Sequence, residues 1–367
     1  MTRVQPVTIL ATGAYLPGEP IDNDALQELC GPLPDDVLSG LQVSRRHWLI
    51  DRATGEHTTT TSKMAEAAAR NALARAGLAP GNVDLIVLST ASPEYHLPTC
   101  ASYLQEHLEL ERCASIELRA GCVGGVQALD IARRHLAGGT CRTAPVIGTE
   151  AISPLLAPAY LGLDSRQVRM RDRLNLYNFG DGAAAVVLQA VAEDSDSEPQ
   201  TSYAYVTACL GGRRKPGMQV IGGGTDMPLA KQAGRKRLME IRLDAAGVAT
   251  FGPRVFVAAL QDLLRHAHLR LADIDVCVLP EGNAGYFSGE LAAAGMSQED
   301  FCQIQGKIVE NLSDVGATGS PAVLLALDAG VEAGRIRPHD TVLLVAIEAS
   351  RYVYAGVALR WGEPMAA

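Results

Sequence analysis

A repeated α/β pattern constrains the fold of this chain more than any other feature of its sequence. Residues 83–88 match residues 274–279, and residues 146–151 match residues 345–349. All four segments are almost wholly apolar, which is typical of parallel strands that are buried on both faces. Two copies of an α/β unit predict two packed sheets with helices between and outside them. We therefore expect an α/β fold built from two duplicated halves.

A glycine-containing turn that leads into a helix belongs to the same repeat. It pairs residues 122–125 with residues 316–319. Residues 192–201 are acidic, polar and poor in apolar side chains, as expected of a surface connection. We expect this connection to separate an N-terminal half, residues 1–195, from a C-terminal half, residues 196–367. A functional site is expected where the turns beyond the strands of both halves meet.

Two long helices are predicted outside the repeated turns. Residues 60–76 form an amphipathic pattern with Thr61 or Ser62 as the N-cap, and residues 253–269 form a second pattern that begins with Pro253. Residues 153–178 are longer and mixed, with four arginines in quick succession. We interpret them as an excursion over the mouth of the site, or alternatively as a surface insertion.

The composition narrows the class of protein. The chain of 367 residues is 47% hydrophobic, which supports a large core, and its net charge of −9 argues against nucleic-acid binding. The eight cysteines are scattered without metal-ligand spacing, so neither a disulfide framework nor a metal is expected, and a reducing cytoplasm fits. No signal peptide and no membrane span are predicted.

The stretch around Cys122 is the strongest candidate for chemistry. Residues 116–120 indicate a strand, Gly121 breaks it, and a helical pattern follows to residue 132. Unpaired N–H groups and the helix dipole at a helix start favour a thiolate over a thiol. These features suggest an enzyme that forms a covalent acyl-cysteine. The alternative is a buried structural cysteine.

Several segments carry a family resemblance when they are taken in order. They are residues 13–17, the short basic segment 43–47, the helix and strand of 65–90, the Gly121–Cys122 turn, and the glycine turn 178–183. In order and spacing, the chain resembles the thiolase superfamily, specifically the ketoacyl-ACP synthase III (KAS III) branch and its acyltransferase relatives.

The resemblance implies a five-layered αβαβα fold, a homodimer, and acyl transfer from a thioester onto Cys122. The acyl donor would be an acyl-CoA or an acyl carrier protein thioester, the acceptor a small molecule, and no bound cofactor would be needed. The resemblance further implies an oxyanion hole. Its donors would be the backbone N–H of Cys122 and one from residues 349–352, for which we select Ser350.

Two positions depart from the pattern of the family. Where the family usually places a histidine after a proline, this chain has Glu281, and where the family has an asparagine in a Gly-Asn-Thr turn, this chain has Ala317. The missing side chains normally donate hydrogen bonds to the enolate of a decarboxylating malonyl thioester. Malonyl condensation is therefore not expected to follow the usual route.

Other residues are candidates for the second half-reaction. Glu281 is either a general base or a carboxylate of a surface turn, and His96 is either a base or a residue of the dimer interface. Asn283 is an orienting candidate. Basic residues at 213–215, 231 and 235–237 would either steer an acidic carrier protein or form an ordinary solvated face.

Three functions remain open from the sequence. The first is an acyltransferase of natural-product, polyketide or fatty-acid-type biosynthesis that passes an acyl group from Cys122 to an acceptor. The second is a carbon–carbon bond-forming 3-oxoacyl-ACP synthase with a non-standard base. The third is a catalytically inactive subunit that supports an active partner.

Overall fold

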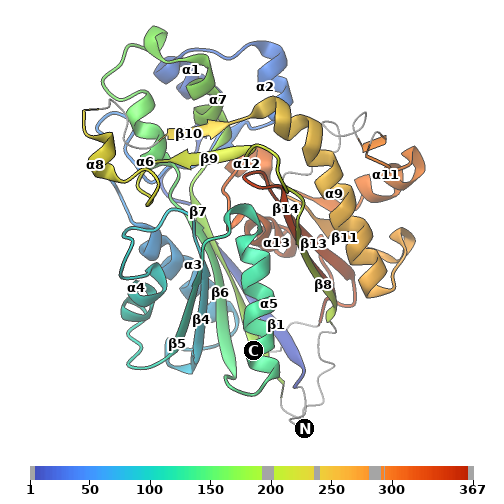
Figure 1. Ribbon diagram of the computed structural model, residues 1–367. Helices are drawn as coiled ribbons and strands as arrows, with labels where there is room; N and C mark the ends of the chain where they lie inside the picture. Colours follow the sequence, from blue (N-terminus) through green and yellow to red (C-terminus); the bar gives the residue numbers. More distant parts are fainter. Residues whose placement is uncertain (1–4, 192–201, 235–239, 281–290, 293, 363–367) are drawn as a thin grey trace.

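Two five-stranded sheets form the framework of the protein (Figure 1). The structure is a computed structural model, and it describes residues 5–191, 202–234, 240–280, 291–292 and 294–362. The first sheet has the strand order β1-β7-β6-β4-β5 and consists of β1 (Val7–Tyr15), β4 (Leu85–Ser89), β5 (Ala114–Leu118), β6 (Thr143–Glu150) and β7 (Gly182–Ala190). The second has the order β8-β14-β13-β11-β12 and consists of β8 (Ser202–Cys209), β11 (Val276–Val278), β12 (Ile308–Val309), β13 (Thr341–Glu348) and β14 (Val353–Arg360).

The two sheets share one topology, which confirms the predicted duplication. In the first sheet β4 runs parallel to β5 and β6, whereas β7 is antiparallel to both β6 and β1. In the second sheet β11 runs parallel to β12 and β13, whereas β14 is antiparallel to both β13 and β8. Every residue of β4 and β6 is buried, as expected for strands covered by helices on both faces.

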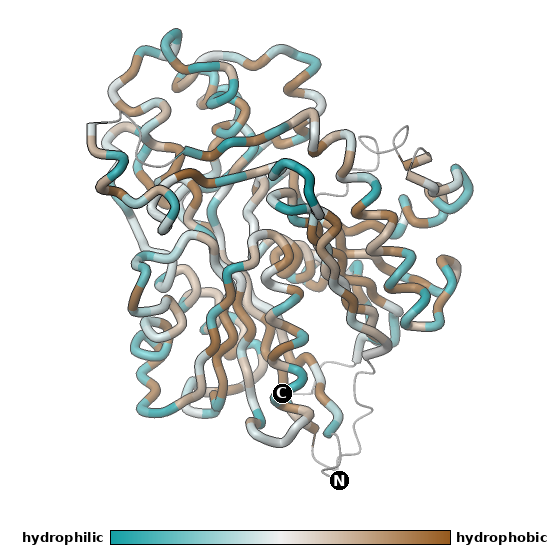
Figure 2. Tube along the Cα trace, in the orientation of Figure 1, coloured by the Kyte–Doolittle hydropathy of each residue, from teal (hydrophilic) through white to brown (hydrophobic). Residues whose placement is uncertain are grey.

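Helices complete a five-layered αβαβα arrangement, as predicted (Figure 1). The outer face of the first sheet is covered by α3 (Thr61–Arg75) and α4 (Cys100–His107), and that of the second by α9 (Ala245–Ala267) and α11 (Gln298–Gln305). The middle layer consists of α5 (Gly124–Ala137) and α13 (Ala322–Glu332), which contact each other and both sheets. Figure 2 shows apolar residues concentrated in the strands and the central helices.

A group of shorter elements lies above the two sheets in Figure 1. They are α1 (Asn23–Cys30), α2 (Asp35–Leu41), α6 (Ser153–Leu156), α7 (Met170–Asn178), α8 (Leu229–Gln232), α12 (Leu312–Val315) and the strand pairs β2 (Ile21–Asp22) with β3 (Arg45–Arg46) and β9 (Met218–Ile221) with β10 (Glu240–Leu243). Single 3₁₀ turns are η1 (Pro80–Asn82), η2 (Gly121–Val123), η3 (Ala157–Ala159), η4 (Ser165–Gln167) and η5 (Leu271–Asp273). None of the helices in the described part of the chain is both long and apolar enough to cross a lipid bilayer.

The helix starts differ from the predictions in two places. The N-cap of α3 is Thr60, whose hydroxyl accepts the Lys63 N–H, rather than Thr61 or Ser62. Helix α9 begins at Ala245, so Pro253 lies inside it and not in its first turn. The Asp244 side chain caps α9 by accepting the Gly247 N–H, and this cap outweighs the usual preference for proline at a helix start.

The repeated turn was predicted in the wrong register. Gly319 and Ser320, not residues 315–316, are the counterparts of Gly121 and Cys122, at the same offset that relates β6 to β13. Both Gly121 (φ 57°) and Gly319 (φ 71°) adopt the left-handed conformation that favours glycine. The predicted boundary between the halves, at residues 195–196, lies outside the described residues and stays a prediction.

Candidate active site

Cys122 lies where the first sheet passes into the central helix layer. Strand β5 ends at Leu118, the 3₁₀ turn η2 carries Gly121 and Cys122, and α5 follows directly at Gly124. The start of α5 packs closely against both halves of the chain, because a Cβ on Gly124 would overlap Ser89 of β4 and one on Gly125 would approach the Ser320 carbonyl of the second half. Cys122 is partly exposed, so it is not the fully buried structural cysteine of the alternative interpretation.

Among the other cysteines, Cys113 and Cys141 are also partly exposed, but they precede the strands β5 and β6 and not a helix. The remaining five differ from Cys122 in exposure. Burial raises the pKa of Cys30, Cys100 and Cys277 to about 12, which keeps these thiols protonated and poorly nucleophilic. Cys209 and Cys302 are exposed on the surface. Cys122 is thus a partly accessible thiol at a helix start.

A buried glutamate connects the Cys122 turn to the end of the second sheet. Glu348, the last residue of β13, is 3% exposed. Its Oε2 accepts the backbone N–H of Cys122 at 2.5 Å, and its Oε1 accepts the backbone N–H of Ser350 at 2.8 Å. A Cβ on Gly121 would overlap this carboxylate, so glycine is required there both for its φ and for space. The two N–H groups predicted as oxyanion donors therefore converge on one anion.

A second buried glutamate occupies the matching place in the other half. Glu150, the last residue of β6, accepts hydrogen bonds from the Ala91 N–H and from the hydroxyls of Ser92 and Ser320. The Ser320 hydroxyl also donates to the Gly121 carbonyl oxygen at 3.0 Å, so this network is hydrogen-bonded to the backbone of the Cys122 turn. Burial raises the pKa of Glu150, and the hydrogen bonds from Ser92, Ala91 and Ser320 oppose that shift.

The glycine turn 178–183 joins the halves beside this site. Phe179 forms a bridge with Ala317, and the Ala317 N–H donates to the Asn178 carbonyl at 2.8 Å. Ala317 is buried and offers only a methyl group. Asp181, in the same turn, is fully buried and accepts the N–H groups of Leu49, Ile152 and Ser153.

Of the remaining predicted site residues, the structure describes only His96. Glu281 and Asn283 lie outside the described residues. His96 is exposed in the connection between β4 and α4, next to Tyr95 and Leu97, which are 59% and 80% exposed. Within the described residues, no group of three or more His, Cys, Asp or Glu side chains is arranged to hold a metal ion.

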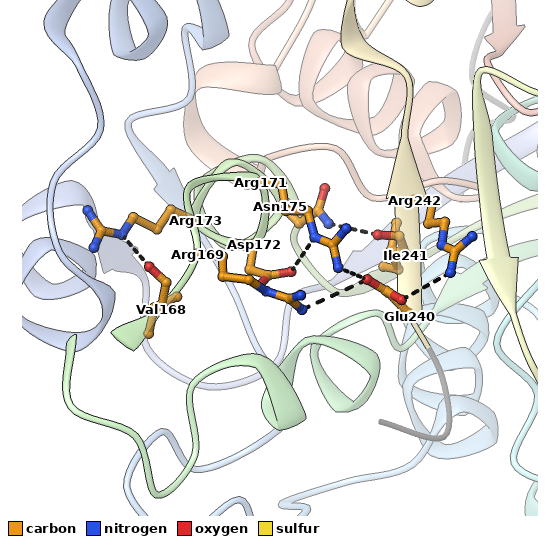
Figure 3. Close-up of polar contacts among 9 residues, drawn as sticks. All are labelled: Val168, Arg169, Arg171, Asp172, Arg173, Asn175, Glu240, Ile241 and Arg242. Atoms are coloured by element: carbon orange, nitrogen blue, oxygen red, sulfur yellow. Dashed lines mark hydrogen bonds and ion pairs between the residues drawn. The ribbon is translucent and has the colours of Figure 1, made fainter. Parts of the chain in front are cut away.

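The arginines of residues 166–173 are used in structural contacts. Figure 3 shows Arg169 paired with Asp172, Arg171 paired with Glu240, and Arg173 donating to the Val168 carbonyl. These contacts connect α7 to β10, since Asn175 also donates to the Ile241 carbonyl. Two of these arginines are therefore paired with carboxylates, Arg169 with Asp172 in the excursion and Arg171 with Glu240 of β10.

A basic groove lies next to the segment that follows Ser350. It has a volume of about 590 Å³, and its lining includes Arg214, Lys215, Phe251, Arg254 and Tyr352. The Arg214 guanidinium stacks on Phe251 at 3.8 Å, and Phe251 contacts the edge of Tyr352. Of the predicted basic patch, residues 213–215 are exposed here, and residues 235–237 lie outside the described residues.

A small apolar pocket adjoins Cys122. Its volume is about 10 Å³, close to the minimum for one water molecule. Its lining combines Cys122 of the first half with residues of the second half: Leu279, Pro280, Ala322, Val323, Val345, Ala346 and Ile347.

Sequence reasoning missed Glu348, Glu150 and Ser320. The repeat offered the signal, because the two glutamates end matched strands and Ser320 stands where Cys122 stands in the other half. A shift of the turn register by four residues concealed this correspondence.

Comparisons with known proteins agree with this geometry. The model of the 3-oxoacyl-[acyl-carrier-protein (ACP)] synthase III family matches residues 116–204, and the model of its C-terminal part matches residues 264–361. The chain is 28% identical to the beta-ketoacyl-[acyl-carrier-protein] synthase III of Symbiobacterium thermophilum, over 98% of this chain and 100% of that protein. It is also 28% identical to the synthase of the same name from Syntrophomonas wolfei, over 97% of this chain and 98% of that protein.

Solved structures give the same result. A tetronic acid condensing enzyme matches with a TM-score of 0.81 and 26% identity, over 96% of this chain and 99% of that enzyme. The 3-oxoacyl-[acyl-carrier-protein] synthase III of Aquifex aeolicus matches in fold with a TM-score of 0.76 and 22% identity, over 97% of this chain and 100% of that one. The priming ketosynthase of a polyketide pathway matches in fold with a TM-score of 0.78 and 22% identity, over 99% of this chain and 98% of that one.

Proposed function

Since the chain belongs to the 3-oxoacyl-[acyl-carrier-protein] synthase III family of thiolase-like condensing enzymes, we propose that it is an acyltransferase that works through an acyl-Cys122 intermediate. The acyl donor is an acyl-CoA or acyl carrier protein thioester. The acceptor is a small molecule of natural-product, polyketide or fatty-acid-type biosynthesis.

One observation carries this proposal. A partly exposed thiol just before α5 belongs to a turn in which the backbone N–H groups of Cys122 and Ser350 both donate to one carboxylate, each to a different oxygen of Glu348. Acyl transfer needs a thiolate and a pair of donors for the tetrahedral oxyanion, and both are built from rigid strand ends and a helix start.

The acylation step follows from these groups. The Cys122 thiolate attacks the thioester carbon, a new C–S bond forms, and the carbonyl π electrons move to oxygen. When the carbonyl re-forms, the C–S bond to the donor breaks, and the donor leaves as a thiol with the proton that Cys122 gave up. The helix start favours the thiolate, because the N-terminal end of the α5 dipole is positive.

The transfer step needs a base that acts on the acceptor. Glu281 is our first candidate and His96, supplied at a dimer interface, is the second; Asn283 would orient the acceptor. Ala317 supports an acceptor other than malonyl, because a methyl group cannot donate a hydrogen bond to an enolate.

The surface suggests how donor and partner bind. The basic groove of Arg214, Lys215 and Arg254 suits the phosphate of a phosphopantetheine arm or an acidic carrier protein. A homodimer is supported by exposed Tyr95 and Leu97 and by β5, which is the last strand of its sheet.

A second candidate is a carbon–carbon condensing enzyme with a non-standard base. It is favoured by the relatives, which are named as ketoacyl synthases or condensing enzymes. It requires a donor for the enolate other than the side chain at position 317.

Mass analysis and carbon dioxide release separate these candidates. Incubation with acyl-CoA and acyl carrier protein thioesters should add one acyl mass to the chain, and Cys122→Ala should remove that adduct. Malonyl thioester should then release no carbon dioxide with the acylated enzyme. Release would favour condensation, and absence of any adduct would leave the inactive-subunit interpretation.

A further inference from the structure

The Glu348 carboxylate accepts both backbone N–H groups that we assign to the oxyanion hole. Its two oxygens accept the N–H groups of Cys122 at 2.5 Å and of Ser350 at 2.8 Å. Oxyanion donors work at about 2.7–3.1 Å from the oxygen that they stabilise. The carboxylate thus satisfies both donors before any substrate arrives.

This contact is built into the backbone and is not a chance rotamer. Glu348 is the last residue of β13 and is 3% exposed, and Gly121 has a left-handed φ of 57° that brings its Cα against the carboxylate. The mirrored turn repeats the design, because Glu150 at the end of β6 faces Gly319 and bonds to Ser320. In that half, Ser320 is buried and the contact is structural.

We propose that Glu348 is an internal ligand of the oxyanion hole, and that its carboxylate must leave the N–H groups of Cys122 and Ser350 before a thioester carbonyl can enter. The proposal rests on the proposed function, since it concerns the acylation of Cys122. Glu348 is a positioning residue that keeps the unloaded site closed. The small pocket beside Cys122, of about 10 Å³, agrees with a closed resting site.

The charge of Glu348 makes the two states mutually exclusive. During acylation the thiolate attacks the carbonyl carbon, and negative charge develops on the carbonyl oxygen until the donor thiol leaves. A carboxylate in contact with the same two donors would repel that oxygen and deprive it of hydrogen bonds. Acylation therefore includes displacement of Glu348, whereas reactions of the sulfur that form no oxyanion do not.

The test compares two reactions of the same sulfur. Octanoyl-CoA acylates Cys122 through an oxyanion, whereas iodoacetamide alkylates it by displacement of iodide without one. The rates of both are followed on the Cys122 peptide by mass spectrometry in the full chain, in Glu348→Ala and in Glu348→Gln. Exposed Cys209 and Cys302 serve as internal references for the alkylation.

We expect Glu348→Ala to raise the ratio of acylation to alkylation by about tenfold or more, because a single oxyanion donor is worth about 10²–10³ in rate. Glu348→Gln should give a smaller rise, since its amide oxygen can still accept the Cys122 N–H while its NH₂ cannot accept that of Ser350. If the variants acted only through the loss of the Glu348 charge, the acylation and alkylation rates of Cys122 would change together, and their ratio would stay the same.

Glu150→Ala is the matched control. It removes a glutamate from the mirrored turn without freeing either donor beside Cys122, so the ratio should not rise. An unchanged or lower ratio in Glu348→Ala would overturn the proposal, as would an equal rise in Glu150→Ala. If neither the wild-type chain nor Glu348→Ala is acylated although both are alkylated at Cys122, the proposed function fails together with this inference. Normal acylation of the wild-type chain with an unchanged ratio removes this inference alone.

Discussion

Asp181 shows how a single buried carboxylate ties the site to its surroundings. It accepts the N–H groups of Leu49, Ile152 and Ser153 and the hydroxyl of Ser153. Burial nevertheless raises its pKa to about 6 against the opposing effect of these hydrogen bonds. The side chain thus holds three segments together, and its charge state depends on pH within an accessible range.

A pH dependence of stability follows from that shift. Between about pH 3.8 and pH 6 the folded chain binds more protons at Asp181 than the unfolded chain does, so the free energy of unfolding falls as pH rises through this window. The full effect is about 3 kcal/mol at about 1.4 kcal/mol per pH unit. Asp181→Asn removes this contribution while keeping one acceptor oxygen.

The contribution of Asp181 to stability is measured by urea unfolding at several pH values between 4.5 and 7.5. The stability of the wild-type chain relative to Asp181→Asn should decrease toward pH 6 and then level off. A difference that is independent of pH would contradict the assigned shift.

The residues of the site were only partly predictable from the sequence. Cys122 was found because a glycine break between a strand and a helix is a local pattern. The carboxylate that contacts its N–H was not found, because Glu348 is 226 positions away along the chain and only packing brings it there. Ser350 was chosen through the resemblance, and the structure places its N–H on the same carboxylate.

At the scale of elements, the Cys122 turn depends on glycine at position 121. Its left-handed φ costs an alanine about 1–2 kcal/mol, and a Cβ would in addition overlap Glu348. Gly319 in the mirrored turn has the same handedness, but the nearest atom to its Cβ would be the Glu150 Cγ, at 3.0 Å.

This difference predicts coupling between Gly121 and Glu348. Gly121→Ala should destabilise the chain more than Gly319→Ala does. In a Glu348→Ala background the cost of Gly121→Ala should fall to about 1–2 kcal/mol, the backbone contribution alone. A double-mutant cycle by urea unfolding checks this, and strictly additive free energies would show that the carboxylate and the glycine do not compete for space.

Strands were easier to predict than helix boundaries. The apolar runs at 83–88 and 341–347 required burial on both faces, and they became β4 and β13. The start of α9 was misplaced because the local proline signal at 253 was weighed above the cap at Asp244, whose effect depends on how the chain enters the helix.

At the scale of the whole molecule, the two sheets share one hydrophobic core. Side chains of the central helices, such as Leu129 and Leu324, pack with Val87 of the first sheet and Leu344 of the second. Neither sheet has a complete covering layer without the other half, because α5 and α13 contact both sheets.

Cooperative unfolding of both halves is therefore expected. The two tryptophans report on different cores, since Trp48 packs in the core around α3 and Trp361 packs in the core between the sheets. Trp48→Phe and Trp361→Phe each leave one tryptophan as the fluorescent reporter. In urea, the fluorescence midpoint of each variant should coincide with the midpoint of the far-UV circular dichroism transition of the same variant. Separate midpoints would show that the halves unfold independently.

The most direct measurement is the location and stoichiometry of the acyl group after brief exposure of the full chain to an acyl thioester. Peptide mass mapping should find close to one acyl group per chain on the peptide that contains Cys122, while exposed Cys209 and Cys302 stay unmodified. An acyl label that follows surface exposure, or none on Cys122, would contradict the covalent mechanism.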